Sequence, residues 1–156
     1  MVSREHLYRV EVEWTGNRGS GTSDYRAYER AHEVRREGKP TLPASSDASM
    51  RGDGARWNPE ELLVAALSQC HMLWYLHLCS VSDVVVESYV DRPEGTMAQA
   101  DDLSGRFTQV TLRPSVSIAD AERLDRAREL HVNAHRMCFI ANSVNFPVTV
   151  EPDFER

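Results

Sequence analysis

The sequence predicts an α+β fold in which antiparallel sheets surround a buried central helix. The expected order of elements is strands, helix, strands, helix, strand, without the regular alternation of strands and helices that produces a parallel sheet. Beyond Leu62, the helix expected at about 59–80 is apolar on nearly every face, as in a helix that is packed on all sides. The 156 residues suffice for a substantial core, so we expect a single domain over residues 1–156.

Composition and charge exclude several classes of protein. The net charge of −6 argues against nucleic acid as the main partner. No positively charged start followed by an apolar run marks a signal peptide. Polar residues such as Ser68 and His71 interrupt the apolar run, whereas a membrane span needs roughly 18 apolar residues with few breaks. We therefore expect a cytoplasmic protein with no membrane partner, in which a disulfide between any of the three cysteines would be transient and catalytic.

The N-terminal third predicts strands and a long loop. Residues 7–14 alternate, with Tyr8, Val10, Val12 and Trp14 on one face, which is typical of a half-buried strand. The other expected elements are a turn at 16–21, a returning hairpin strand at 22–28, a weaker strand at 32–35, and a loop at 38–54 whose length is usual for functional or partner-bound segments.

Start signals predict a helix from about Pro59 to about Ser80. Asn58 can accept from the first free N–H groups, Pro59 suits the first helical position, and Glu60 and Glu61 suit the positive end of the helix dipole. Beyond it we expect strands at 84–90, 107–114 and 146–150, a polar turn region at 93–105, and an amphipathic helix from Asp120 to about Arg136 with Ala121, Leu124, Ala127, His131 and Ala134 on its buried stripe.

The three cysteines differ in what their positions permit. A buried cysteine is ordinarily an inert small hydrophobe. Cys79 follows Cys70 by nine residues, on the opposite helix face and about 13 Å along the axis, too far for a disulfide, which needs Cα atoms within about 7 Å. Cys138 lies at or just beyond the end of the second helix. Cys70 and Cys138 could meet if the two helices pack together, but spacing alone does not decide it.

Histidines and acidic residues offer weaker candidates. His131 and His135 share a helix face, but Val132 replaces the glutamate of the metalloprotease pattern and no third ligand is evident, so we predict no metal and a capping or surface role. Glu60 precedes Cys70 by ten residues, about 15 Å along a helix. It could reach a thiol only through a bridging group, such as the arginine Arg51 or Arg56, or on another chain.

Two segments of the sequence together resemble a known family. Residues 58–63, Asn-Pro-Glu-Glu-Leu-Leu, followed by Ala65-Ala66 and Cys70, are similar to the signature of the OsmC/Ohr family of thiol peroxidases. Residues 134–144 resemble the second cysteine segment of that family, and residues 147–152 resemble its last strand. The order of elements matches along nearly the whole chain.

The resemblance implies an OsmC-like fold and an intertwined homodimer with two active sites at the interface. It implies that Cys70 is the peroxidatic thiol and Cys138 the resolving thiol. Glu60 would orient an arginine that stabilises the thiolate, both groups coming from the partner subunit. In OsmC-like members this arginine lies a little upstream of Asn-Pro-Glu, a position that favours Arg51. In Ohr-like members it lies in the first hairpin, which favours Arg18, and Arg26 is a further candidate.

The same resemblance implies a reaction without a cofactor. Cys70 would reduce a hydroperoxide and become a sulfenic acid, Cys138 would condense with it to a disulfide, and a dithiol such as a lipoyl protein would restore both thiols. Residues 72–75 could line an entrance for organic hydroperoxides or simply pack in the core. The alternatives are a non-catalytic redox sensor or small-ligand-binding dimer on the same scaffold, and three thiols that only pack.

Overall fold

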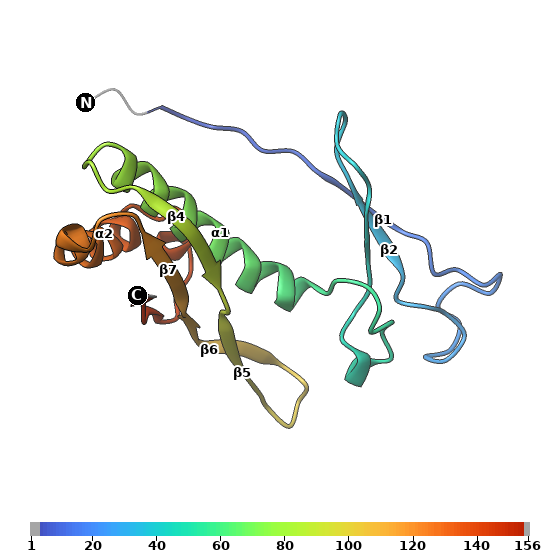
Figure 1. Cartoon of the computed structure of the whole chain (residues 1–156). Helices are drawn as coiled ribbons and strands as arrows, with labels where there is room; N and C mark the ends of the chain where they lie inside the picture. Colours follow the sequence, from blue (N-terminus) through green and yellow to red (C-terminus); the bar gives the residue numbers. More distant parts are fainter. Residues whose placement is uncertain (1–3, 155–156) are drawn as a thin grey trace. The chain divides into compact units, whose positions relative to one another are not determined.

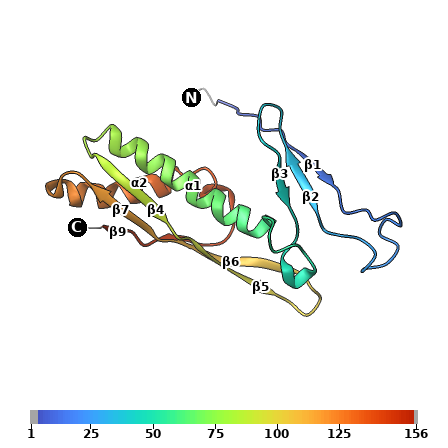
Figure 2. The same ribbon diagram turned by 45° about the vertical axis from the view of Figure 1, so that its right-hand side comes forward.

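The computed structural model describes residues 4–154. The chain folds into two compact units, Met1–Leu62 and Leu63–Arg156, whose elements are drawn in Figures 1 and 2. The predicted α+β class is confirmed, because helices and mainly antiparallel sheets occur together. That the two units make up a single domain stays a prediction.

The first unit contains one antiparallel sheet in the order β1-β2-β3. Its strands are β1 (Glu11–Trp14), β2 (His32–Arg35) and β3 (Leu42–Ala44). The predicted return strand at 22–28 is wrong, because β1 pairs with β2, with Glu11 opposite Arg35. Local turn chemistry explains the difference: the Asn17 side chain accepts hydrogen bonds from the N–H groups of Gly19 and Gly21, which have positive φ angles.

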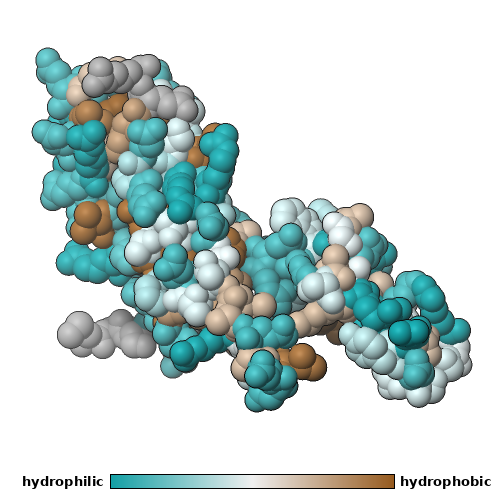
Figure 3. Space-filling model, turned by 90° about the horizontal axis from the view of Figure 1, so that it is seen from below, coloured by the Kyte–Doolittle hydropathy of each residue, from teal (hydrophilic) through white to brown (hydrophobic). Residues whose placement is uncertain are grey.

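The apolar side chains of residues 8–14, of which Glu11–Trp14 form β1, are exposed. Tyr8, Val10, Val12 and Trp14 were expected to be half-buried, yet all are exposed, Val12 by 63%. Large hydrophobic residues are exposed in both units, and the face shown in Figure 3 displays them in brown among hydrophilic residues. An exposed row of this kind on a sheet is typical of a surface that another molecule covers.

Residues 38–54, predicted as a long loop, contain regular structure. Besides β3 they form a short 3₁₀ helix, Ala48–Met50, whose first N–H groups are capped by the Asp47 carboxylate. The next residue, Arg51, adopts a left-handed conformation with φ 65°. A Cβ on Gly52 would lie 1.6 Å from the Ser46 carbonyl oxygen, so only glycine fits there.

The central helix, α1 (Pro59–Ser80), has the bounds that its start signals predict. The Asn58 side chain accepts from the Glu61 N–H (2.8 Å) and the Glu61 carboxylate accepts from the Asn58 N–H (3.2 Å), a reciprocal capping box. The fully buried residues form one stripe at intervals of four: Leu67, His71, Tyr75 and Cys79. The expectation of packing on all sides is not met within one chain, since Leu73 is 62% exposed. By length and composition alone α1 would also suit a membrane span, as core helices of soluble proteins do.

The second unit has two three-stranded sheets. One has the order β4-β7-β9, with β4 (Val86–Asp91), β7 (Pro114–Ile118) and β9 (Asp153–Phe154); the other has the order β5-β6-β8, with β5 (Glu94–Gln99), β6 (Gly105–Leu112) and β8 (Val148–Val150). The β6–β8 and β7–β9 pairs are parallel, so the sheets are mixed rather than purely antiparallel. The polar turn region predicted at 93–105 is wrong, because Glu94–Gln99 form β5; the residues of this strand are all exposed and show no apolar alternation.

One cluster of buried residues places the second helix against α1. α2 (Leu124–Met137) follows a short 3₁₀ helix, Ala121–Arg123, and buries Ala127, His131 and Ala134 as predicted. Ala121 is exposed because it belongs to the 3₁₀ turn and not to the α-helical stripe. The core cluster joins the C-terminal half of α1 to α2, β4 and β7, so the end of α2 comes to lie beside α1 (Figures 1 and 2).

Candidate active site

Cys70 and Cys138 lie within interaction distance of each other, although 68 positions separate them in sequence. Cys70 is half-buried in the middle of α1, while Cys138 is 1% exposed and is the first residue after α2. Both are free thiols. The packing of α2 against α1 thus brings together the two thiols whose meeting the sequence left open.

The two thiols differ in environment. Burial, together with interaction with Cys70, raises the pKa of Cys138 to about 11. The Cys138 sulfur also accepts a hydrogen bond of 3.4 Å from the Ala141 N–H. At neutral pH Cys138 is therefore a protonated thiol, whereas Cys70 is the more accessible sulfur. This arrangement suits Cys70 as the first nucleophile and Cys138 as the second thiol to react.

An apolar cavity of about 390 Å³ opens beside Cys70. Its lining comprises Cys70, Leu73, Trp74 and His77 from α1, and Phe139 from the segment after α2. The Trp74 ring meets the Phe139 ring edge to face, with centroids 5.5 Å apart. Of the four residues expected to line an entrance, Leu73 and Trp74 do so, while Tyr75 is buried in the core. A hydrophobic small molecule could reach the Cys70 sulfur through this cavity.

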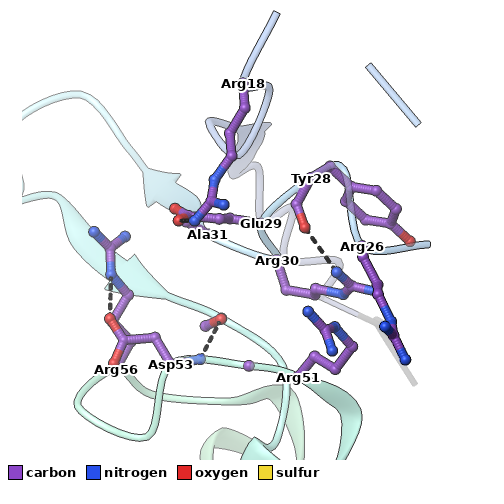
Figure 4. A pocket seen from close by; sticks show the side chains of 11 residues that line it. Arg18, Arg26, Tyr28, Glu29, Arg30, Ala31, Arg51, Asp53 and Arg56 are labelled. Atoms are coloured by element: carbon purple, nitrogen blue, oxygen red, sulfur yellow. Dashed lines mark hydrogen bonds and ion pairs between the residues drawn. The ribbon is translucent and has the colours of Figure 1, made fainter. Parts of the chain in front are cut away.

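All three candidate arginines line one cavity of the first unit. Arg18, Arg26 and Arg51 surround a space of about 280 Å³, together with Arg30 and Arg56 (Figure 4). Arg18 forms an ion pair with Glu29, and Arg56 forms one with Asp53. Within residues 4–154, neither Arg26 nor Arg51 has an ion-pair partner. Their guanidinium groups are therefore available to another group.

Glu60 lies in the first turn of α1, as predicted, and is half-buried. The reciprocal cap is made by its neighbour Glu61, which leaves the Glu60 carboxylate out of the capping box. In the part of the chain that the structure describes, Glu60 has no ion pair. Arg51 and Glu60 belong to the first unit and the two thiols to the second, so the roles predicted for Arg51 and Glu60 stay predictions.

Cys79, whose role the sequence left open, is a core residue. It is buried beside Tyr75 and packs in the cluster between α1 and α2. Burial raises the pKa of its thiol. A protonated, buried thiol is chemically inert, which agrees with the packing role expected for this position.

A buried histidine pair next to the thiols was missed by sequence reasoning. His71 Nε2 and His131 Nδ1 are 3.0 Å apart, and the His131 ring stacks on Tyr75 with centroids 3.8 Å apart. Burial lowers the pKa of His71 to about 4 and that of His131 to about 3. The predicted surface or capping role of His131 is therefore wrong. The available signal was its own place on the buried stripe of α2.

No metal centre is evident near these histidines. His135, on the same helix face as His131, has a buried Nδ1 without a hydrogen-bond partner. Among residues 4–154, no three His, Cys, Asp or Glu side chains are grouped so as to hold a metal ion.

Comparisons with known proteins identify the family and the fold of the chain. A family model described as OsmC-like protein matches residues 52–153. An OsmC-like protein of unknown function from Vibrio cholerae O1 biovar eltor is 32% identical, with 95% of this chain and 99% of that one covered and a TM-score of 0.85. None of the proteins with curated functions matches the sequence.

Two more distant structures share the fold. An organic hydroperoxide resistance protein OsmC from Legionella pneumophila is 18% identical and has a TM-score of 0.64. The match covers 97% of this chain and 100% of the Legionella chain. An organic hydroperoxide resistance protein from Elizabethkingia anophelis is 17% identical, with coverages of 98% and 99% and a TM-score of 0.67. At such low identities the likeness concerns the fold alone.

Proposed function

The chain belongs to the OsmC-like family, and we propose that it is a thiol-dependent peroxidase that reduces organic hydroperoxides. The observation that carries the proposal is the pairing of the accessible Cys70 sulfur with the buried Cys138 thiol beside an apolar cavity. A lone buried cysteine would support packing only; two adjacent free thiols of different exposure support a redox cycle.

The proposed cycle has three steps. The Cys70 thiolate attacks the O–O bond of the hydroperoxide, so that the alcohol leaves after taking up a proton and Cys70 becomes a sulfenic acid. The Cys138 sulfur then attacks the Cys70 sulfur, which forms the disulfide and releases water. A dithiol reductant, such as a lipoyl protein, finally reduces the disulfide by thiol exchange and is itself oxidised to a disulfide.

The proposal assigns supporting roles outside the thiol pair. Arg51 stabilises the Cys70 thiolate and Glu60 orients Arg51, with both groups supplied by the partner subunit of a homodimer. Their freedom from ion pairs within one chain, over residues 4–154, supports this assignment. Arg18 serves less well because it already pairs with Glu29. A cytoplasmic location, where reductants keep thiols reduced, belongs to the same proposal.

Organic hydroperoxides are favoured over hydrogen peroxide by the lining of the cavity. Leu73, Trp74 and Phe139 present apolar surface next to Cys70, and burial of an apolar substrate tail there is favourable by roughly 25 cal/mol per Å². Two structural relatives carry the name organic hydroperoxide resistance protein. We expect a higher kcat/KM for cumene hydroperoxide than for hydrogen peroxide.

A turnover assay tests the proposal. Purified protein is mixed with cumene hydroperoxide or hydrogen peroxide, with dihydrolipoamide as the dithiol, and peroxide loss is followed. Cys70→Ser is expected to abolish turnover, while Cys79→Ser, a matched loss of a thiol from the same helix, keeps it. Wild-type turnover that persists in Cys70→Ser would refute a cysteine peroxidase.

A redox sensor is the second candidate, and the raised pKa of Cys138 favours it. A thiol with a pKa of about 11 has little thiolate at neutral pH, which slows its attack on the sulfenic acid, and it is a poor leaving group, which slows reduction of the disulfide by attack on the Cys70 sulfur. A sensor would form the Cys70–Cys138 disulfide with one equivalent of peroxide but would turn over slowly with every reductant. Steady-state turnover with dihydrolipoamide therefore separates a sensor from an enzyme.

A further inference from the structure

We propose that the arginine cavity of the first unit, lined by Arg18, Arg26, Arg30, Arg51 and Arg56, binds the oxyanion group of a small molecule, a carboxylate or a phosphate. This inference goes beyond the peroxidase cycle, in which one arginine beside the thiolate suffices. It concerns a binding site that is formed entirely by residues of the first unit.

The charge of the cavity is the first argument. Five guanidinium groups line it, against two carboxylates, those of Glu29 and Asp53. The two carboxylates are engaged by Arg18 and Arg56. Arg26 and Arg30 are then left without a countercharge in the lining, as is Arg51, which the peroxidase proposal pairs with Glu60 outside the lining; the net charge of the chain is −6. A concave surface with such an excess attracts anions.

The fixed position of Arg30 is the second argument. Its guanidinium donates to the carbonyl oxygens of Tyr28 (2.7 Å) and Tyr25 (2.9 Å), and it lies over both rings, 4.1 and 4.4 Å from their centroids. Figure 4 shows this arginine together with Arg26 and Arg51 at the same cavity. An arginine held in this way loses little side-chain freedom when an oxyanion binds.

The loop that carries Arg51 and Arg56 is equally well defined. The buried Ser45 hydroxyl accepts from the Asp53 N–H (3.0 Å), and the Ser45 N–H donates to the Trp57 carbonyl oxygen (2.9 Å). Between Ser45 and Trp57, the left-handed conformation of Arg51 and the tightly enclosed Gly52 fix the shape of the turn. The geometry of the cavity is thus set by backbone hydrogen bonds, as in a site that is formed before its ligand arrives.

Arginine is the residue type suited to this ligand. A planar guanidinium can donate two parallel hydrogen bonds to a carboxylate or phosphate, which a lysine cannot do. A volume of about 280 Å³ accommodates such a group with several further heavy atoms. The shared chemistry is therefore an oxyanion on a small molecule, and binding measurements decide between its two sources.

The test is calorimetric titration of the full chain at constant ionic strength, in one arm with inorganic phosphate and in another with succinate. We expect saturable binding of at least one of them. Arg26→Gln, which removes an exposed arginine without an ion pair in the described chain, is expected to weaken that binding about tenfold or more. The stronger of the two arms identifies the carboxylate or the phosphate as the preferred group.

Two further variants make the result specific. Arg36→Gln removes an exposed arginine of the same unit outside the cavity, and its binding should match the wild type. Arg26→Lys keeps the charge but loses the planar guanidinium and its two parallel hydrogen bonds. This variant should bind the anion less tightly than the wild type but more tightly than Arg26→Gln. Equal weakening by Arg26→Gln and Arg36→Gln would mean mere charge screening and would overturn the site, as would the lack of saturable binding in both arms. Unchanged melting temperatures show that each variant is folded.

Discussion

At the scale of single residues, the two thiols are distinguished by exposure and by their neighbours. Cys70 faces an apolar cavity, whereas Cys138 is buried, receives the Ala141 N–H, and has a raised pKa. The order of reaction in the proposed cycle rests on this difference, because peroxide would reach the exposed sulfur before the buried, protonated one. The second thiol is needed only after Cys70 has been oxidised.

Removing the second thiol should trap the first intermediate. In Cys138→Ser, peroxide is expected to oxidise Cys70 once, and the sulfenic acid persists because no thiol condenses with it. Labelling with a sulfenic-acid reagent such as dimedone, followed by mass spectrometry, should find one adduct per chain, on Cys70. Cys79→Ser serves as the control and should give the disulfide instead. Labelling on Cys79, or none, would contradict the assignment.

The buried histidine pair predicts a dependence of stability on pH. The pKa values of His71 and His131 fall from about 6.5 to about 4 and about 3, so the unfolded chain binds protons that the folded chain does not. As far as this pair is concerned, the free energy of unfolding should therefore be highest above pH 6.5 and should fall as the pH is lowered towards 4. Urea denaturation at pH 7 and pH 5 measures the loss.

A variant separates this effect from other titrating groups. His131→Gln removes one member of the pair and should show a smaller change in stability between pH 7 and pH 5, although it is less stable at pH 7. His77→Gln, which replaces an exposed histidine of α1, the helix that carries His71, should keep the wild-type pH dependence. An equal pH dependence in all three proteins would rule out the pair as its source.

At the scale of elements, the helix start and the arginine loop are determined by local chemistry. The capping box of Asn58 and Glu61 makes α1 begin where the sequence predicts. The loop that carries Arg51 was harder to predict, because its shape depends on a close approach of Gly52 to the Ser46 carbonyl that no periodicity reveals. The same holds for β5, whose exposed residues carry no strand pattern.

Adding a methyl group at Gly52 should deform the arginine loop. In Gly52→Ala the new Cβ would meet the Ser46 carbonyl oxygen at 1.6 Å, which forces the backbone to move. We expect a loss of about 1–3 kcal/mol in the free energy of unfolding. Peroxidase turnover, in which Arg51 is proposed to stabilise the Cys70 thiolate, should also fall. Gly54→Ala is a close control, because its nearest neighbour would be the Ala48 Cβ at 3.9 Å. Equal stability of both variants in urea denaturation would contradict the close approach.

The site itself was only partly predictable from local sequence. Position and residue type made Cys79 a packing residue, and the structure agrees. The meeting of Cys70 and Cys138 depends on how α2 packs against α1, a long-range contact that spacing does not determine. For His71, the sequence indicates only that its side chain points to a different side of the helix from Cys70. Its buried hydrogen bond to His131 depends on the packing of two helices and is not evident from local sequence. Local patterns thus identify elements, while contacts between elements require the fold.

At the scale of the whole molecule, the exposed apolar surface bears on the proposed homodimer. The row of Tyr8, Val10, Val12 and Trp14 is exposed, and α1 is fully buried along one stripe only. Isolated chains rarely leave so many neighbouring apolar residues in contact with water. The homodimer proposed above would cover such surface, and it would also supply the partner's arginine and glutamate to each thiol pair.

A charge placed on the exposed row should weaken the dimer. Light scattering of the wild-type protein is expected to give twice the 17.7 kDa of one chain. Val12→Lys would bury an unpaired charge at the interface, so the dimer should dissociate at lower dilution and peroxidase turnover should fall with it. Thr22→Lys, at an exposed turn of the same unit, should remain dimeric. A monomeric wild type with full turnover would contradict the shared site.

The position of Cys138 also bears on how the fold would tolerate repeated formation and reduction of the proposed disulfide. Cys70 belongs to the regular part of α1, whereas the backbone at Cys138 has already left the helix, with ψ 110°. The carbonyl of Cys138 accepts from Asn142 and its sulfur from Ala141, so both are tied to a short turn. A bond that forms and breaks between the sulfurs needs adjustment of this turn rather than of α1. In the proposed disulfide cycle the hydrophobic core would thus stay closed through many rounds of oxidation, and the protein would be spared the aggregation that repeated opening favours.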